Sequence, residues 1–254
     1  MRDFLRDVSA MIELELRRLK HDRTEIYARA VQPILWLAIY GYIMSSIKAI
    51  PTGGIPYIDY ITPGVMVQSI LFMSIFYGIT IIWERESGIL KKLLATPAPR
   101  YAIVVGRAMA SAPRAMLQVL ILVPVALLLG VRFIPNVAYF SLSMVLIFLA
   151  SGGFAAISIL IASFMKTRDR FMGIGQAIVM PLFFASNALY PVSIMPPIMQ
   201  YVSALNPVSY LVDATRGLMI SGNLSGLPVD IAAILAFDVI IFLLASISFK
   251  RIVE

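Results

Sequence analysis

Residues Tyr60–Trp83 read YITPGVMVQSILFMSIFYGITIIW, and residues Glu84–Arg100, which follow them directly, read ERESGILKKLLATPAPR. The first stretch contains no charged residue and exceeds the ~20 residues that a helix needs to cross the hydrocarbon layer of a membrane. Because backbone polar groups in lipid must be paired within their own segment, we predict a membrane-spanning helix there. The second stretch interrupts an apolar chain with six charges and two prolines.

The composition extends this interpretation to the whole chain of 254 residues, which we treat as one domain. Hydrophobic residues make up 60% of the chain and charged residues only 14%, whereas about a quarter of the residues in soluble domains are charged. A soluble fold of this length would have no core large enough for so much apolar surface. The sequence therefore predicts an all-α, multi-pass protein of the plasma or inner membrane.

Six apolar segments are long enough to be spans. In chain order they are Ala30–Ile47, Tyr60–Trp83, Ala115–Val131, Ala138–Met165, Phe171–Leu189 and Ile231–Phe249. Of the 21 lysines and arginines, only three lie on one side of the membrane in this arrangement: Lys48, Arg132 and Arg216. The positive-inside rule then places both termini in the cytoplasm, and it explains the net charge of +7 without a nucleic-acid partner.

Residues 1–25 have the pattern of an amphipathic helix. Apolar residues recur at helical spacing along one stripe: Phe4, Leu5, Val8, Met11, Ile12, Leu16 and Leu19. Charged residues fill the remaining positions, and Glu13 and Arg17 are placed to form an i,i+4 pair. We expect this helix to lie in the plane of the lipid headgroups; the alternative is a soluble helix packed on a partner.

The charged stretch Glu84–Arg100 predicts a short cytoplasmic helix. Ser87 is a candidate N-cap, and Pro97 and Pro99 end the helix because proline lacks an amide donor. One face of this helix carries four apolar residues: Ile89, Leu90, Leu93 and Leu94. A helix of about two turns is not stable alone, so a partner must pack on that face. The alternative is an ordinary charged loop.

The run ERESGILKKLLATPAPR, followed by Val105-Gly106-Arg107, resembles the cytoplasmic signature of type-2 ABC exporter permeases. In that family a pattern E-R-E-x-G-x-L-x-x-L-x-x-T/S-P lies between the second and third spans. Tyr190-Pro191-Val192-Ser193 and Asn206-Pro207 extend the similarity late in the chain. The chain is most similar to the daunorubicin-resistance-type drug exporter permeases.

The resemblance implies that Glu84–Arg100 is a coupling helix docked on a separate ATPase subunit. The residues implied at this contact are Glu84, Arg85, Glu86, Leu90, Leu93, Leu94 and Thr96. It also implies a homodimer with two ATPase subunits, which would bind ATP and Mg²⁺, because this chain has no G-x-x-x-x-G-K-[S/T] loop. Ile89-Leu90-Lys91 stands where relatives more often have Thr-Leu-Glu, so this face is more basic here.

Arg100, Arg107 and Arg114 are seven residues apart and therefore lie on one side of a helix. We expect this helix to run along the cytoplasmic interface and to bend at Pro113 into the third span. The arginines either extend toward lipid phosphates or, in the case of Arg107 and Arg114, attract an anionic substrate headgroup.

Few polar residues lie inside the predicted spans. Asp238 is the only acid well inside one, so it should face protein or water, as a structural group or as part of the translocation path. Gln176 and Asn187 fall in the fifth span and can bond across helices. Two small-xxx-small pairs permit close helix packing, Gly152 with Ala156 and Gly173 with Ala177. The fifth span is thus a candidate for the subunit interface and the pathway wall.

The connection from Tyr190 to Asp230 is rich in proline and apolar in its middle, which predicts short helices that re-enter the outer leaflet. Asp213 and Arg216, three residues apart, are expected to form a salt bridge that stabilises a gate.

Three functions remain open. The first is the non-catalytic membrane subunit of an exporter for amphipathic substrates such as drugs, lipids or lipid-linked glycans. The alternative is an ion-coupled secondary transporter, which would need intramembrane acids or broken helices beyond Asp238. An intramembrane enzyme is disfavoured because His21, the only histidine, lies in the N-terminal arm and the chain has no cysteine. We therefore expect no metal and no cofactor bound by this chain.

Overall fold

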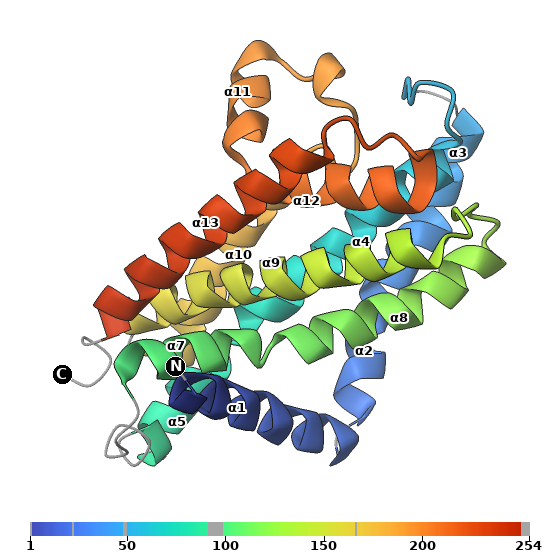
Figure 1. The fold of residues 1–254 in the computed structure, drawn as a ribbon. Coiled ribbons are helices and arrows are strands. Elements are labelled where there is room, and N and C mark those ends of the chain that lie inside the picture. The colour runs from blue at the N-terminus through green and yellow to red at the C-terminus, as the bar shows by residue number, and fades with distance from the viewer. Residues whose placement is uncertain (1, 22, 48–49, 91–98, 166, 250–254) are drawn as a thin grey trace.

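The computed structural model describes residues 2–21, 23–47, 50–90, 99–165 and 167–249. In these ranges every regular element is a helix. The long helices run along one common direction and form a bundle (Figure 1). The all-helical, multi-pass class predicted from the sequence is thereby confirmed.

The N-terminal half contains α1 (Arg2–His21), α2 (Arg23–Leu35), the π-helical turn η1 (Trp36–Gly41), α3 (Tyr42–Ile47), α4 (Tyr57–Phe76), α5 (Ile79–Glu86), α7 (Arg100–Met109) and α8 (Ala112–Leu128). The C-terminal half contains α9 (Val137–Phe164), α10 (Arg168–Phe184), η2 (Val192–Ile194), α11 (Pro197–Leu205), α12 (Pro207–Arg216), η3 (Gly217–Ser221) and α13 (Leu227–Ser248).

Among the described residues, five helical stretches are long and apolar enough to cross a membrane. They are Tyr27–Ile47, Tyr57–Glu86, Tyr101–Leu128, Val137–Phe164 and Leu227–Ser248, and they correspond to the first, second, third, fourth and sixth predicted spans. The fifth predicted span, Phe171–Leu189, corresponds to α10, which has 17 residues and ends at Phe184. The sixth crossing therefore stays a prediction.

A turn after α10 explains why this helix is shorter than predicted. The Ser186 hydroxyl donates to the Phe183 carbonyl at 2.7 Å, and the Ala188 amide donates to the Ser186 hydroxyl at 3.3 Å. The turn packs directly on α4, where a Cβ added to Gly64 would overlap the backbone of Ala188. Asn187 therefore lies in this turn, after the end of α10, and not within a helix.

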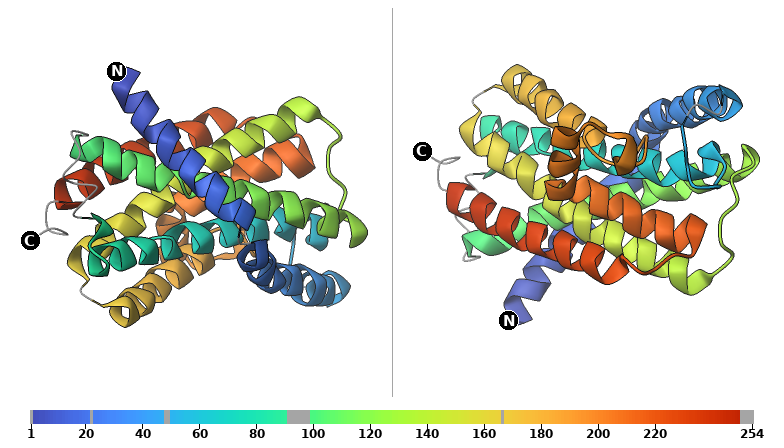
Figure 2. Two further views of the ribbon diagram at one scale, coloured as in Figure 1. Left: turned by 90° about the horizontal axis from the view of Figure 1, so that it is seen from below. Right: turned by 90° about the horizontal axis from the view of Figure 1, so that it is seen from above.

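The segment before the third span bends almost where the sequence predicted. The bend lies at Ala110 and Ser111, between α7 and α8. Pro113 occupies the first turn of α8, where backbone amides have no partner within the helix, so the missing amide hydrogen of proline costs no hydrogen bond. The α1 helix crosses the outer side of α7 and α8 (Figure 2), and a Cβ added to Gly106 of α7 would overlap the Met11 side chain. The N-terminal helix is thus packed on its own chain.

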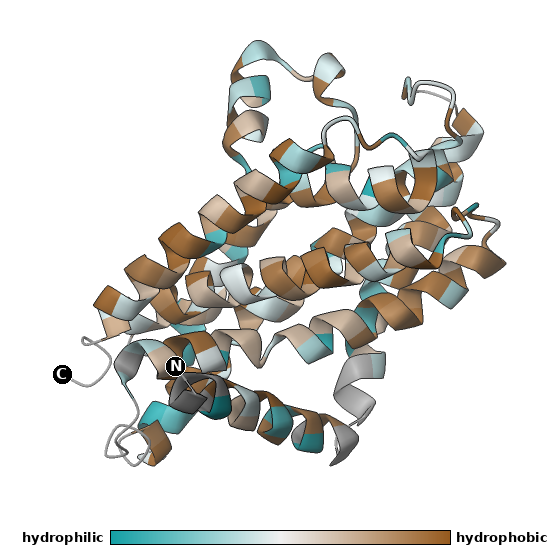
Figure 3. Ribbon diagram, viewed as in Figure 1, coloured by the Kyte–Doolittle hydropathy of each residue, from teal (hydrophilic) through white to brown (hydrophobic). Residues whose placement is uncertain are grey.

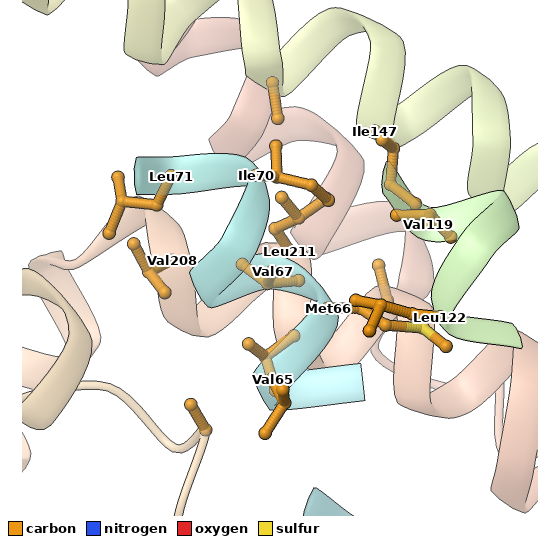
Figure 4. Packing of buried hydrophobic residues seen from close by; sticks show 14 of the residues in the cluster. Val65, Met66, Val67, Ile70, Leu71, Val119, Leu122, Ile147, Val208 and Leu211 are labelled. Atoms are coloured by element: carbon orange, nitrogen blue, oxygen red, sulfur yellow. The ribbon is translucent and has the colours of Figure 1, made fainter. Parts of the chain in front are cut away.

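The α4 helix is the centre of the bundle. Almost all of its residues are buried, which fits a sequence that is apolar on every side. Figure 4 shows the side chains packed around it, which come from α4, α8, α9 and α12: Val65, Met66, Val67, Ile70, Leu71, Val119, Leu122, Ile147, Val208 and Leu211. The outer helix α13 is apolar along most of its length (Figure 3), and several of its large apolar side chains are exposed, as lipid contact requires.

The contact between α9 and α13 depends on a glycine opposite an acid. Asp238 of α13 is 6% exposed, and a Cβ added to Gly153 of α9 would overlap its carboxylate oxygen. Gly152 similarly makes room for the Met109 side chain of α7. The small-residue pattern in the fourth span therefore serves close packing, as expected.

Replacing Gly153 by alanine should destabilise the bundle by about 1–3 kcal/mol, because the added methyl group overpacks a buried contact. The measurement is the midpoint of thermal unfolding in detergent. Gly41→Ala is the matched control, since the atom nearest to a Cβ at Gly41 lies at 3.5 Å, an ordinary van der Waals contact. Equal midpoints for the two variants would contradict the proposed role of Gly153.

Candidate functional site

The Glu84-Arg85-Glu86 sequence at the end of α5 contacts three other parts of the bundle. The Glu84 carboxylate lies 2.7 Å from the Arg107 guanidinium of α7, and the Arg85 guanidinium donates to the Met165 carbonyl at 2.8 Å, just after α9. Glu86 pairs with Arg168 at the start of α10. Each of these three residues thus connects α5 to a different helix.

These contacts differ in burial. Glu84 and Arg107 have side chains 6% and 9% exposed, whereas Glu86 and Arg168 are each 43% exposed. A buried ion pair contributes little net stability, but losing one partner leaves an uncompensated charge in a medium of low polarity. The Arg168 guanidinium also lies 4.1 Å from the Trp83 ring centroid, a cation–π contact. The α5–α7 connection is therefore the more sensitive of the two.

A second buried ion pair connects α1 to the bundle. Glu15 is 1% exposed and accepts a hydrogen bond from Arg114 Nε at 2.6 Å and one from the Tyr77 hydroxyl at 3.2 Å. The sequence prediction missed Glu15. A signal was present, because Glu15 falls seven residues after Val8 and therefore lies on the buried stripe as its single acid. Leu16, by contrast, is 47% exposed and does not belong to that stripe.

Arg107 and Arg114 were predicted to attract an anionic headgroup, and each is paired with an acid of this chain. Arg114 nevertheless lines an open cavity of about 820 Å³ together with Trp83, Glu86 and Arg168. This cavity lies beside the end of α5, on the predicted cytoplasmic side. The attraction of a headgroup by these arginines stays a prediction.

The predicted ATPase-contact residues are only partly described. Leu90 is 3% exposed and Ile89 is 47% exposed, while Leu93, Leu94 and Thr96 lie outside the described residues. The Ser87 hydroxyl donates back to the Glu84 carbonyl at 3.3 Å, and its predicted role as the N-cap of the following helix stays a prediction. Gly88 has a φ of +73°, which is typical of a helix C-terminus, so this segment ends α5.

At the opposite end of the bundle, Arg216 is the centre of a polar cluster. It is 7% exposed, and its guanidinium donates to the Tyr60 carbonyl at 3.2 Å and to the Asn187 carbonyl at 2.9 Å. It also lies 3.2 Å from the Asp213 carboxylate and 3.8 Å from the Tyr60 ring centroid. The predicted Asp213–Arg216 pair forms, and it is one of four contacts that hold this arginine.

The electrostatics of this cluster follow from its burial. The Asp213 side chain is half exposed, but its partial desolvation still raises the pKa of its carboxyl above the usual range, and the neighbouring Arg216 opposes that shift. Burial lowers the pKa of Arg216. The negative charge of Asp213 opposes this shift, because it favours the protonated guanidinium. Both groups line an open cavity of about 480 Å³, which also contacts Asn187 and Asp230.

The remaining predicted pathway residues lie apart from both clusters. Gln176 is exposed on the surface of α10. Asp238 faces α9 inside the bundle, and its Oδ1 atom accepts no hydrogen bond from the described part of the chain. No group of three or more histidine or acidic side chains capable of holding a metal occurs among the described residues.

Comparisons with known proteins place this geometry in context. Residues 6–220 match the family described as ABC-2 type transporter. The chain is 25% identical to the transport permease ycf38 of Cyanophora paradoxa, over 99% of this chain and 90% of that one. It is 26% identical to the daunorubicin resistance ABC transporter permease protein DrrB1 of Streptomyces coeruleorubidus, over 79% and 70%. The inner membrane transport permease YadH of Escherichia coli is 23% identical, over 73% of each chain.

Replacing Glu84 by glutamine should destabilise the protein strongly, by about 3–5 kcal/mol, because Arg107 would remain buried without a countercharge. The measurement is the thermal unfolding midpoint in detergent. The double variant Glu84→Leu/Arg107→Met should recover most of the loss. Glu86→Gln is the matched control and should cost only about 0–1 kcal/mol, since its ion pair is exposed; an equally small effect of Glu84→Gln would contradict this interpretation.

Exchanging the charges of Asp213 and Arg216 should not restore the protein. An aspartate at position 216 cannot donate to the Tyr60 and Asn187 carbonyls, so the swap Asp213→Arg/Arg216→Asp should be as unstable as Arg216→Asp alone. Asp213→Asn should be mild, because three of the four contacts of Arg216 remain. Thermal unfolding of the four proteins tests this, and recovery in the swap would show that the ion pair alone matters.

Proposed function

The chain belongs to the ABC-2 type transporter family and is the membrane subunit of an ABC transporter; from that premise we propose that it acts as an exporter. In this proposal two copies of the chain form the translocation path, and each copy docks one separate ATPase subunit, which binds ATP and Mg²⁺. The chain itself is a non-catalytic transport subunit.

The observation that carries the coupling proposal is the set of contacts made by Glu84, Arg85 and Glu86. The segment that follows them, up to Arg100, is the proposed docking element for the ATPase. Because these three residues bind α7, the end of α9 and α10, a movement of the docking element is passed to three helices at once. The Glu84–Arg107 ion pair is the buried one of these contacts, and breaking it is costly, so α7 should follow the docking element most closely.

The proposed membrane topology has six crossings, with α10 as the fifth, and both termini in the cytoplasm. The two ends of the described chain lie at the same end of the bundle as α5 and α7, and α3 lies at the opposite end (Figure 1). Seventeen helical residues rise about 25 Å, which is close to the thickness of the hydrocarbon layer. In this topology residues 190–230 form the external re-entrant segment and residues 1–25 the interfacial helix.

We place the contact between the two copies on α10. This helix lies at the edge of the bundle (Figure 2), and its outward face contains Met172, Gly173, Gln176 and Ala177, all exposed. Small residues on a lipid-facing surface allow another helix to approach closely, and the Gln176 side chain can bond across such a contact.

The proposed substrates are amphipathic: drugs, lipids or lipid-linked glycans. The similarity to a daunorubicin resistance permease supports a drug or a drug-like amphiphile. The 820 Å³ cavity supports the same class, because charged and aromatic side chains meet in it, Arg168 and Glu86 beside Trp83.

The test is to co-express the chain with an ABC ATPase of its source organism and to measure ATP hydrolysis in nanodiscs with a panel of amphiphiles. We expect a stable complex whose ATPase activity rises with at least one amphiphile. In the same preparation, Gln176→Cys should give a disulfide-linked dimer, since the chain has no cysteine of its own. Cysteine at Leu243, exposed on α13, is the matched control and should not cross-link.

Transport that is driven by a proton gradient and is independent of the ATPase would instead favour the ion-coupled alternative, with Asp238 as its candidate proton site. Failure of the chain to bind the ATPase would overturn the exporter proposal.

A further inference from the structure

A cavity, called the polar cavity below, lies between α2, α4 and α8 and is open on the side where Arg29 and Gln32 of α2 line it, both exposed. Its volume is about 260 Å³. Four uncharged polar side chains line it: Gln32 from α2, Gln68 and Ser69 from α4, and Gln118 from α8. Phe72 and Met73 supply the apolar part of the wall. These residues belong to three stretches that are long and apolar enough to cross the membrane, so the cavity places hydrogen-bonding groups inside a membrane-spanning region.

The Gln118 side chain is the most unusual feature of this cavity. It is 1% exposed, and neither its oxygen nor its nitrogen has a hydrogen-bond partner in the described part of the chain. Buried polar groups are almost always bonded, and an unmet one weakens the fold. An apolar residue of the same size would fill this position without that penalty. Its presence therefore indicates a partner that enters the cavity.

A second chamber adjoins the first. The 820 Å³ cavity beside α5 shares Arg29 and Met73 with the polar cavity, so the two are neighbours. Its wall includes the aromatic side chains Phe76 and Trp83. The charges of the larger chamber are already engaged within the protein, as in the Arg168–Glu86 ion pair. The two chambers together offer an apolar, aromatic surface next to a set of neutral hydrogen-bonding groups.

We propose that the polar cavity binds the uncharged, hydroxyl- or carbonyl-bearing part of an amphiphile, whose apolar part lies in the larger chamber. Carboxamides both donate and accept hydrogen bonds, so Gln32, Gln68 and Gln118 match hydroxyl and carbonyl groups. An ionic group would lose its hydration here, and the one charged side chain in the wall, Arg29, already interacts within the chain. The proposal rests on the proposed export function and names the site and the chemical class of its substrate.

The experiment uses the absence of cysteine from the chain. Ser69→Cys places a single thiol in the cavity wall, and its rate of labelling by N-ethylmaleimide is measured on the full chain in nanodiscs without an ATPase. The probe is 1-oleoylglycerol, which has an uncharged dihydroxyl head. Two comparison ligands of similar chain length are 1-octadecene, which has no polar head, and oleate, which is anionic.

We expect 1-oleoylglycerol to slow the labelling severalfold, and 1-octadecene and oleate to slow it little. Adding Gln118→Met in the same background should raise the half-protecting concentration about tenfold, which corresponds to about 1.4 kcal/mol. Gln200→Met, on the external helix α11, is the matched control and should leave protection unchanged. Gln118→Met should not lower the thermal unfolding midpoint, because no hydrogen bond within the described chain is lost.

Several results would overturn the proposal. Equal protection by 1-octadecene would show a purely apolar site, and stronger protection by oleate would show an anion site. Unchanged protection in Gln118→Met would show that Gln118 does not contact the ligand, and absence of protection by 1-oleoylglycerol in the parent protein would show that the cavity holds only water. A thiol that never reacts would show that no ligand can enter. A lower unfolding midpoint for Gln118→Met would assign Gln118 a structural role. Because these measurements need no ATPase, a negative outcome leaves coupling to be judged separately by the complex and its ATP hydrolysis.

Discussion

The neutralisation of two arginines, Arg107 and Arg114, is the constraint on which the predicted cytoplasmic end of the bundle depends. Each is held by an acid from another helix, Glu84 of α5 and Glu15 of α1. A charge at the boundary of an apolar bundle is tolerated only with a partner, so these pairs fix where α1 and α5 sit against α7 and α8. The segment after Glu84 therefore begins from a rigidly held position, which a docking element requires if movement is to reach the helices.

The same constraint is met differently elsewhere in the molecule. Arg216 is held by one acid, two backbone carbonyls and the face of Tyr60. Asp238 has a glycine opposite it, where Gly153 leaves room for the carboxyl group. Arg216 and Asp238 thus each depend on a few specific neighbours, whereas the apolar packing around α4 is spread over many side chains. Substitutions at the polar positions should accordingly have sharper effects than conservative changes in the core.

The sequence was sufficient to predict features that depend on local pattern. Five of the six spans followed from the length of apolar runs, and the Asp213–Arg216 pair followed from a spacing of three residues. Contacts between distant parts of the chain were not predictable in this way. The acid that pairs with Arg114 lies 99 residues earlier, and α10 ends where its turn meets a glycine of α4. The sequence around Arg114 has no periodic pattern that points to Glu15, and the sequence around the end of α10 has none that points to Gly64.

The unbonded Gln118 shows why polar residues in membrane helices carry functional information. A buried ion pair needs no ligand to account for it, because each charge has a partner that compensates for its lost hydration. A buried carboxamide with two unmet groups has no such explanation in the described chain. Since lipid tails cannot supply hydrogen bonds, the missing partner is either water or a ligand.

The cavity beside Gln118 adjoins the chamber lined by Trp83 and Glu84, so a ligand bound there would lie next to the residues that connect α5 to the rest of the bundle. Occupancy of the site and position of the docking element would then influence each other, because any ligand that favours one arrangement of α5 shifts the balance toward it.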